Sequence, residues 1–287
     1  MSTLERDAAM GIEAAIGRRP VRLAPLSGGC IAEIYRADFD DGEILVAKFA
    51  GEGGDLMLEA YMLEYLRAHS ALPVPTVIHG GGDLLIMEFI ETSGPLDASA
   101  QAHAGELLAA LHAVSAPSFG HERDTLIGPL PQPNPRQATW LDFFRDQRLL
   151  YMARVALDAG RLPTATMGRI ETLAGRLGAW IEEPAQPSLI HGDMWGGNVL
   201  ASNARIAGFV DPAIYYVDAE IELAFATLFS TFGEPFFRRY GEIRPIRAGF
   251  FDSRRDLYNL YPLLVHVRLF GGGYVASLEA NLGKLGC

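Results

Sequence analysis

Three polar residues near the middle of this 287-residue sequence have the types and the order that phosphoryl transfer from ATP requires. Asp193 and Asn198 lie in the segment LIHGDMWGGNVL, and Asp211 follows after a further apolar run. The reaction needs a carboxylate that orients and deprotonates an acceptor hydroxyl, and oxygen ligands that hold Mg²⁺ on the phosphates. Each residue alone is more often a turn former, so the rest of the chain has to support this interpretation.

Two further polar residues lie in an apolar context earlier in the chain. Lys48 alternates inward on the predicted strand EILVAKFA, and a buried lysine needs a counter-charge. Glu59, on the helix predicted to follow, is the nearest candidate. Ahead of both, Gly28 and Gly29 are predicted to form a turn, with Cys30 next to them, and its backbone N–H groups could approach phosphate oxygens because glycine has no Cβ. This order is typical of the phosphate-handling half of a kinase. A snorkelling lysine and an ordinary turn are the alternatives.

The composition is that of a globular protein and argues against a nucleic-acid partner. Hydrophobic residues make up 49% of the chain and charged residues 21%. The net charge of −11 does not suit a phosphate backbone. Two cysteines are too few for a disulfide framework. No signal-peptide core and no apolar run near the ~20 residues of a membrane span is found, so we expect a cytoplasmic protein.

Predicted secondary structure divides the chain into a β-rich part and a helical part. In the first part, an amphipathic helix precedes predicted strands and one helix, in the order 21–26, 31–39, 43–50, helix 54–69 and two strands within 73–91. A predicted linker at 92–99 leads to elements that are mainly helical, namely helices 102–114, 140–157, 167–183 and 254–270, a proline-rich loop at 128–137 and a strand at 204–213. We therefore expect an α+β protein with lobes at 1–91 and 92–287.

Several segments together resemble the fructosamine kinase (ketosamine-3-kinase) family, relatives of the aminoglycoside phosphotransferases within the protein-kinase-like fold. In chain order the matching segments are SGGCIAEIYRA (27–37), VAKF (46–49), LEAYMLEYL (58–66), FGHERDTLIGPLPQPN (119–134), HGDMWGGN (191–198), DPAIYYVDAEIELA (211–224) and LFGGGY (269–274). HGD-x-W-x-G-N followed by DPA-x-YY is far more specific than HGD alone. The resemblance implies two lobes, a small five-stranded antiparallel N-terminal lobe with one key helix and a larger, mainly helical C-terminal lobe.

The resemblance also implies a role for each polar position. Asp193 would be the catalytic base, and Asn198 and Asp211 would hold Mg²⁺. Lys48, paired with Glu59, would contact the α and β phosphates of ATP. Further nucleotide contacts would come from the turn at Gly28, Gly29 and Cys30, and from the backbone near Glu88 and Ile90, which would bind the adenine.

On the acceptor side, the sequence leaves structural and functional roles open for two residues. Trp195 could stack on a sugar or belong to the core, and His266 could line the acceptor pocket or be an ordinary helix histidine. His191 is predicted to brace the loop through its backbone rather than to act as the base. Val217 and Ala219 stand where the family more often has glycine and arginine, so acceptor-side detail is the least secure part of the match.

The function implied is ATP-dependent phosphorylation of the 3-hydroxyl of a ketosamine, small or protein-bound, and hence deglycation of amines or proteins. The alternatives are a kinase for an aminoglycoside or amino alcohol, and a nucleotide-binding scaffold without catalysis. We expect a monomer or weak dimer, with neither nucleic acid nor membrane as partner. Glu222 occupies the position of an acidic residue that supports the catalytic loop. A separate hypothesis is that oxidation of Cys30 blocks ATP binding or links two chains.

Overall fold

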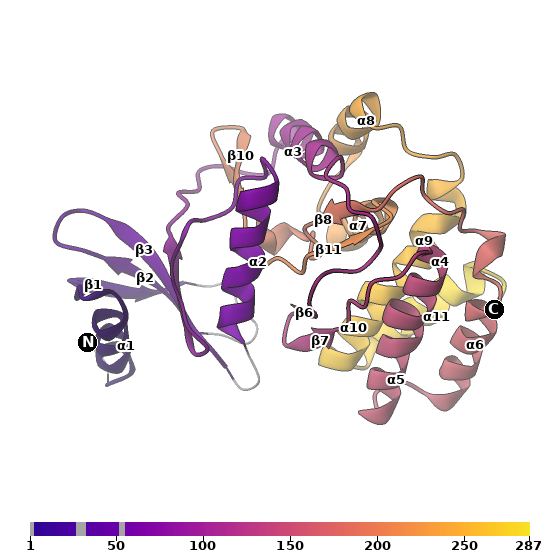
Figure 1. Cartoon of the computed structure of the whole chain (residues 1–287), viewed down its shortest axis with the longest axis horizontal. Coiled ribbons are helices and arrows are strands. Elements are labelled where there is room, and N and C mark those ends of the chain that lie inside the picture. The colour runs from indigo at the N-terminus through magenta and orange to yellow at the C-terminus, as the bar shows by residue number, and fades with distance from the viewer. Residues whose placement is uncertain (1–2, 27–32, 52–54) are drawn as a thin grey trace. The chain divides into compact units, whose positions relative to one another are not determined.

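The computed structural model describes residues 3–26, 33–51 and 55–287, with only the backbone for residues 3 and 4. The predicted turn at Gly28, Gly29 and Cys30, and with it the oxidation hypothesis, lies outside the described residues. Internal contacts divide the chain into two compact units, Met1–Ala100 with Gly197–Pro212, and Gln101–Gly196 with Ala213–Cys287 (Figure 1). The sequence-based boundary between residues 91 and 92 stays a proposal. Among the described residues, no helix combines the length and apolar character needed to cross a membrane.

The first unit is built on a five-stranded antiparallel sheet, as the resemblance implied. Its strands, in the spatial order β1-β2-β3-β5-β4, are β1 (Arg22–Pro25), β2 (Glu33–Asp38), β3 (Ile44–Phe49), β5 (Leu84–Glu88) and β4 (Val77–Gly80). Helix α1 (Thr3–Ile16) packs on one face of this sheet, where Ala9 and Ile12 are fully buried with residues of β2, β3 and β5. Apolar side chains that alternate along the strands therefore form the core beneath α1.

Helix α2 (Leu56–His69) contacts β4 and β5 and carries Glu59 in its first turn. Asp55 caps the helix, because its carboxylate accepts hydrogen bonds from the backbone N–H groups of Met57 and Leu58. The buried face of α2 consists of Leu56, Ala60, Met62, Leu63 and Leu66. The cap and this apolar face together fix the rotation of the helix, which is what directs Glu59 toward β3.

A hairpin from far along the sequence belongs to the same unit. It consists of β9 (Val199–Ser202) and β10 (Arg205–Phe209). The Phe209 N–H donates to the Pro73 carbonyl at 2.8 Å, and the Ser93 N–H donates to the Ala201 carbonyl at 3.0 Å. At Gly208, a Cβ would stand only 2.4 Å from the Ile90 side chain. These links attach the segment that ends in Asp211 to the first unit.

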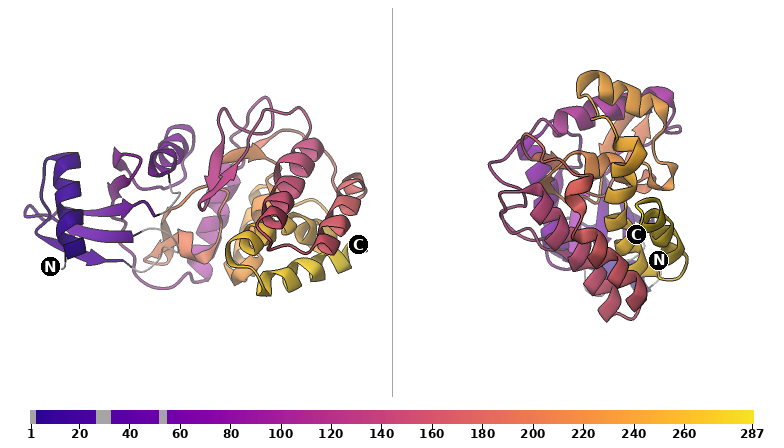
Figure 2. Two further views of the ribbon diagram at one scale, coloured as in Figure 1. Left: turned by 90° about the horizontal axis from the view of Figure 1, so that it is seen from below. Right: turned by 90° about the vertical axis from the view of Figure 1, so that its right-hand side faces the viewer.

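The second unit is mainly helical. Its α-helices are α3 (Ala98–Leu111, beginning at the boundary of the first unit), α4 (Trp140–Phe143), α5 (Tyr151–Asp158), α6 (Thr164–Ala174), α7 (Glu220–Phe225), α8 (Glu234–Ile243), α9 (Arg255–Tyr258), α10 (Leu260–Phe270) and α11 (Gly273–Lys284). Helices α5, α6, α10 and α11 pack around one another (magenta to yellow in Figure 2). Short 3₁₀ turns occur at Leu177–Ala179, Gly196–Asn198 and Leu228–Ser230, and π-helical turns at Phe144–Leu150 and Phe250–Arg254.

Four predicted helices differ in detail from the structure. The helix predicted over 102–114 is Ala98–Leu111, and the one predicted over 167–183 is Thr164–Ala174, followed by the 3₁₀ turn Leu177–Ala179. The helix predicted over 140–157 forms, but its middle is the π-helical segment Phe144–Leu150. The helix predicted over 254–270 is interrupted at Asn259, because Pro262 has no N–H to donate to the carbonyl of Tyr258. Part of the predicted proline-rich loop is a small hairpin of β6 (Thr125–Ile127) and β7 (Leu130–Gln132).

Strands β8 (Ser188–Ile190) and β11 (Tyr215–Val217) pair antiparallel and hold the loop that carries Asp193. Gly192 in this loop has φ +90°, a conformation that L side chains rarely adopt. A Cβ there would lie 2.0 Å from the Ala213 carbonyl oxygen. The Ala213 N–H also donates to the His191 carbonyl at 2.7 Å, so neither backbone can move away cheaply. Glycine is therefore required one residue before Asp193.

We predict that Gly192→Ala destabilises the protein by about 2–4 kcal/mol, since strain at φ > 0 adds to a clash with backbone. Gly196→Ala is the matched control from the same loop, because Gly196 has φ below zero and open space where its Cβ would be. Urea unfolding of both variants provides the measurement. Equal stability of the two would show that the loop does not hold Gly192 in this conformation.

Candidate active site

The first unit brings together three of the predicted site residues. The Lys48 ammonium donates to both carboxylate oxygens of Glu59, at 2.9 and 2.7 Å, and to Oδ1 of Asp211 at 2.9 Å. Lys48 comes from β3 and Glu59 from α2, while Asp211 follows β10. Both Lys48 and Glu59 are nearly buried, whereas the Asp211 side chain keeps about a third of its surface exposed. The expected Lys48–Glu59 ion pair is thus formed, and Asp211 joins it.

This trio carries one positive and two negative charges, and the imbalance decides its protonation. Burial would lower the pKa of Lys48, but the charges of Asp211 and Glu59 outweigh it and hold that pKa above its ordinary value. Burial, assisted by the charge of Asp211, raises the pKa of Glu59 to about 7, although Lys48 opposes the shift. One ammonium group can hydrogen-bond both carboxylates but can neutralise the charge of only one, unless a further cation is bound.

Asp211 and Asn198 have the donor chemistry of a magnesium site that relies on nucleotide phosphates. The Val210 N–H donates to the Asn198 carbonyl at 3.1 Å, which ties Asn198 to the residue before Asp211. Asp211 itself has φ +53°, and such backbone outliers in non-glycine residues cluster at functional sites. Mg²⁺ usually takes one or two protein oxygens and completes its shell with phosphates and water. The oxygen ligands offered here fit that pattern.

The segment predicted to bind adenine ends β5. The Glu88 N–H donates to the Thr76 carbonyl at 2.9 Å, and the Glu88 carboxylate accepts from the Thr76 N–H and hydroxyl. The backbone N–H of Glu88 is therefore already used and is not available to donate to a base. The Ile90 side chain packs directly against Gly208.

Asp193 lies in the second unit, on the loop after β8. It is partly buried, and its N–H faces Nδ1 of His191 at 3.4 Å. His191 is fully buried, so it braces the loop backbone as predicted and is not placed to meet solvent. Trp195 is 36% exposed and lies two residues after Asp193 in a tight turn, with its N–H donating to the Asp193 carbonyl at 3.1 Å. Its exposure favours a contact role for Trp195 over a core role.

A buried carboxylate holds this loop from behind. Glu222 accepts hydrogen bonds from the N–H groups of Gly192, at 2.6 Å, and His191, at 3.3 Å. It also accepts from Nε2 of His112 at 2.8 Å, and Nδ1 of His112 meets the Tyr240 hydroxyl. Burial would raise the pKa of Glu222, but these donors outweigh it and lower that pKa. Glu222 therefore stays ionised. His112 and Tyr240 were not singled out from the sequence, where His112 follows an apolar helix and Tyr240 lies in a helix with several charged residues.

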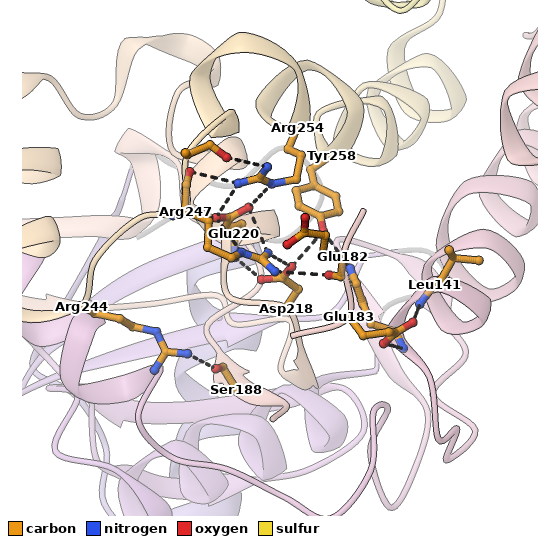
Figure 3. Close-up of polar contacts among 12 residues, drawn as sticks. Leu141, Glu182, Glu183, Ser188, Asp218, Glu220, Arg244, Arg247, Arg254 and Tyr258 are labelled. Atoms are coloured by element: carbon orange, nitrogen blue, oxygen red, sulfur yellow. Dashed lines mark hydrogen bonds and ion pairs between the residues drawn. The ribbon is translucent and has the colours of Figure 1, made fainter. Parts of the chain in front are cut away.

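Two further carboxylates at the start of α7 are neutralised by arginines (Figure 3). Arg247 pairs with Asp218, and Arg254 donates to both oxygens of Glu220, at 2.6 and 3.1 Å. The Tyr258 hydroxyl donates to Asp218 at 2.9 Å. These ion pairs hold the start of α7 in place, and with it Glu222, two residues after Glu220 in the same helix.

The positions that depart from the family pattern lie inside this buried region. Val217 is fully buried on β11, and Ala219 is 5% exposed. Neither side chain is therefore exposed enough to contact an acceptor, and the departure changes packing rather than recognition.

His266 on α10 lies in an aromatic group with Phe229 and Tyr274, at ring-centroid distances of 4.9 and 4.8 Å. Its Nδ1 is 2.7 Å from the Pro262 carbonyl, which can only accept, so Nδ1 carries the proton. Burial lowers the pKa of His266 and favours the neutral ring. Nε2 is then a hydrogen-bond acceptor.

We predict that Lys48→Met lowers the free energy of unfolding by about 3–5 kcal/mol, since it leaves Glu59 buried beside a second carboxylate. The loss of stability relative to wild type grows as pH rises above about 7. Without Lys48, the pKa of Glu59 in the folded variant is higher than the wild-type value of about 7, so ionisation of Glu59 above that pH opposes folding of the variant. Urea unfolding of both proteins without nucleotide, at pH values below and above 7, measures this difference.

The double variant Lys48→Met/Glu59→Leu is the control for this prediction. It removes both buried charges, and we expect it to regain most of the lost stability. A double variant as unstable as the single one would contradict the pairing.

Comparisons with known proteins agree with this geometry. The family model for fructosamine kinase matches residues 9–285. A Synechocystis protein assigned as a ketoamine kinase is 36% identical, covering 90% of this chain and 88% of its own. The chloroplastic protein-ribulosamine 3-kinase of Arabidopsis thaliana is 34% identical, with 89% and 80% covered. The crystal structure of a Thermobifida fusca protein assigned as a fructosamine-3-kinase superposes with a TM-score of 0.87 at 32% identity, covering 96% and 97%. The chain thus belongs to the fructosamine kinase family and is a phosphotransferase with the protein-kinase-like fold.

Proposed function

We propose that this protein transfers the γ-phosphoryl group of ATP to the 3-hydroxyl of a ketosamine, a ketose joined to an amine. The observation that carries the phosphoryl-transfer chemistry is the Lys48 ammonium bound at once to Glu59 and Asp211. The acceptor class is supported by the HGDMWGGN and DPAIYY segments and by relatives named for ketoamine and ribulosamine. The resulting 3-phosphate is prone to elimination, so the outcome implied is deglycation.

The residues of the first unit act on the nucleotide. Lys48, oriented by Glu59, contacts the α and β phosphates and offsets their charge. Asn198 and Asp211 would hold Mg²⁺, which supplies further positive charge on the transferring phosphoryl group when bound. The Glu88 carbonyl and the Ile90 backbone bind the adenine edge. Gly28, Gly29 and Cys30, which lie outside the described residues, would contribute phosphate contacts according to the sequence prediction.

The residues of the second unit act on the acceptor. Asp193 accepts a hydrogen bond from the 3-hydroxyl and takes its proton as the oxygen attacks phosphorus. Trp195, exposed beside Asp193, offers a flat face on which a sugar ring stacks. Nε2 of His266 accepts a hydrogen bond from a second hydroxyl of the ketose. The cellular location is part of the same proposal. A chain with only two cysteines suits a reducing compartment, and we therefore propose a cytoplasmic location.

An acceptor panel tests the proposal directly. With Mg-ATP, we expect phosphorylation of ribulosamine, erythrulosamine or fructosamine, both free and on lysine side chains of a glycated protein, and no turnover of aminoglycosides or amino alcohols. Phosphorus NMR of the product locates the phosphate on the 3-oxygen. Turnover of an aminoglycoside alone would replace the proposed acceptor with the alternative one, and nucleotide binding without any turnover would favour the scaffold.

Asp193→Asn tests the catalytic base. We expect a loss of at least ~10²-fold in kcat with little change in ATP affinity, because the amide cannot accept the proton. Asp158→Asn, an exposed residue at the end of α5, is the control and should match wild type. Wild-type kcat in Asp193→Asn would mean that another group deprotonates the acceptor.

A further inference from the structure

A guanidinium group is buried in the second unit without a counter-ion. Arg148 is fully buried, and it lies in the π-helical segment Phe144–Leu150, a type of turn that is frequent at functional sites. Within the part of the chain that the structure describes, it donates hydrogen bonds to neutral acceptors, which include the carbonyls of Pro133 and Gln147 and Oδ1 of Asn134. Among the described residues it has no carboxylate partner, and its Nε has no hydrogen-bond partner at all. Such burial is costly and calls for a physical reason.

Aromatic faces supply part of the compensation. The Arg148 guanidinium carbon lies 3.9 Å from the ring centroid of Tyr215, 4.7 Å from that of Phe143 and 5.5 Å from that of Tyr261. Cation–π attraction is strongest when the cation is desolvated, as it is here. Arg148 therefore links α4, β11 and α10 around one charge.

Asn134, which Arg148 binds, belongs to a second group of buried, hydrogen-bonded residues that includes Gln132 and Thr125. Two residues before Asn134, the Gln132 amide donates to Thr125 Oγ1 at 2.8 Å and to the Ala213 carbonyl at 3.2 Å. The Gln132 carbonyl accepts from the Tyr261 hydroxyl at 2.7 Å. Asn134 also donates to Thr125 Oγ1 at 2.8 Å. The side chains of Gln132 and Asn134 thus hold the segment 128–137 through several buried hydrogen bonds.

Ala213 connects this group to the catalytic loop. Its N–H donates to the His191 carbonyl at 2.7 Å, and its carbonyl oxygen is the atom that excludes a side chain at Gly192. The same carbonyl oxygen accepts from Gln132. A shift of Gln132 would therefore free the backbone against which Gly192 is packed, next to Asp193.

We propose that Arg148 and Gln132 are positioning residues that hold the catalytic loop in its reactive conformation, through the strap Arg148–Asn134–Gln132–Ala213. All four residues of the strap belong to the second unit, whereas Lys48 and Asp211 belong to the first. Its loss should therefore lower kcat and leave ATP binding unchanged. The effect on turnover rests on the proposed kinase function, whereas the effect on the loop does not.

Gln132→Met is the first test, because methionine keeps the length of the side chain and removes both amide donors. We expect kcat for the ketosamine to fall by about tenfold to a hundredfold, as for other misplaced reactive groups. KM for ATP should stay within about twofold of wild type, since no interaction with the nucleotide is removed. Hydrogen exchange of the amides of residues 190–194 should become faster, because the Ala213 backbone is less restrained.

Arg148→Ala is the second test, and Arg145→Ala is its control. Arg145 lies three residues earlier in the same helical segment, but it is partly exposed and pairs with Asp142 and Asp146. Removal of Arg148 leaves a cavity between aromatic faces, and such cavities bind small molecules that fit them. Millimolar guanidinium chloride should therefore restore part of kcat in Arg148→Ala and have no effect on wild type or Arg145→Ala.

Two results would overturn the proposal. One is a Gln132→Met enzyme with wild-type kcat and unchanged amide exchange at residues 190–194. The other is a rise in KM for ATP as large as the fall in kcat, which would indicate a general disturbance of the fold. If the wild-type protein phosphorylates no ketosamine, the proposed function is wrong. The strap is then still tested by hydrogen exchange of the amides of residues 190–194 in Gln132→Met, which does not depend on activity.

Discussion

The reactive loop of this protein depends on one buried carboxylate. Glu222 receives two consecutive backbone N–H groups of the loop and one imidazole N–H, and it is fully enclosed. An ionised carboxylate in such surroundings must keep all of its donors, because losing one leaves charge uncompensated in a medium that cannot solvate it. If the loop moved away, Glu222 would be left as a buried charge without its hydrogen-bond donors. The free-energy cost of that state exceeds the net contribution of a single hydrogen bond, and it is this cost that holds the loop in place.

The surroundings of Glu222 make that restraint directional. The paired carboxylates Asp218 and Glu220 anchor the start of α7 to Arg247 and Arg254, so the helix cannot follow the loop if the loop moves (Figure 3). Ala213 is also packed against Gly192 in the loop. Asp193 thus follows a backbone that is held by both Glu222 and Ala213, which suits a residue that has to orient a hydroxyl without rearranging.

Much of the fold follows from local sequence, and what does not follow has identifiable physical causes. The five strands, α2 and the Lys48–Glu59 pair could be predicted because alternation, a capping Asp55 and an inward lysine act over short distances. The second strand of the hairpin at 125–132 falls within the loop predicted over 128–137, since prolines obscure short strands. The π-helical turns have no recognisable pattern, because a widened turn keeps almost the same apolar spacing.

The site was also only partly predictable. Asp193 and Asp211 stand out through motif order, whereas His112, Arg148 and Gln132 act through partners that are far away in the sequence. A lone histidine or glutamine gives no sign of what it will meet after folding. The grouping of residues 197–212 with the first unit likewise depends on long-range backbone bonds to Pro73 and Ser93.

Unbalanced charge distinguishes the functional parts of the molecule from its purely structural ones. The α7 carboxylates are matched by arginines and need nothing further. The Lys48 trio has an excess of negative charge, which a divalent cation on a nucleotide would relieve, so binding and charge balance reinforce each other. Arg148 carries a buried positive charge, and among the residues that the structure describes its contacts are with aromatic faces and neutral oxygens. A chain selected for stability alone would replace such groups with apolar ones, since unpaired buried charges lower stability. Their presence next to the segments that carry Asp211 and Asp193 is therefore best explained by the reaction that these segments perform.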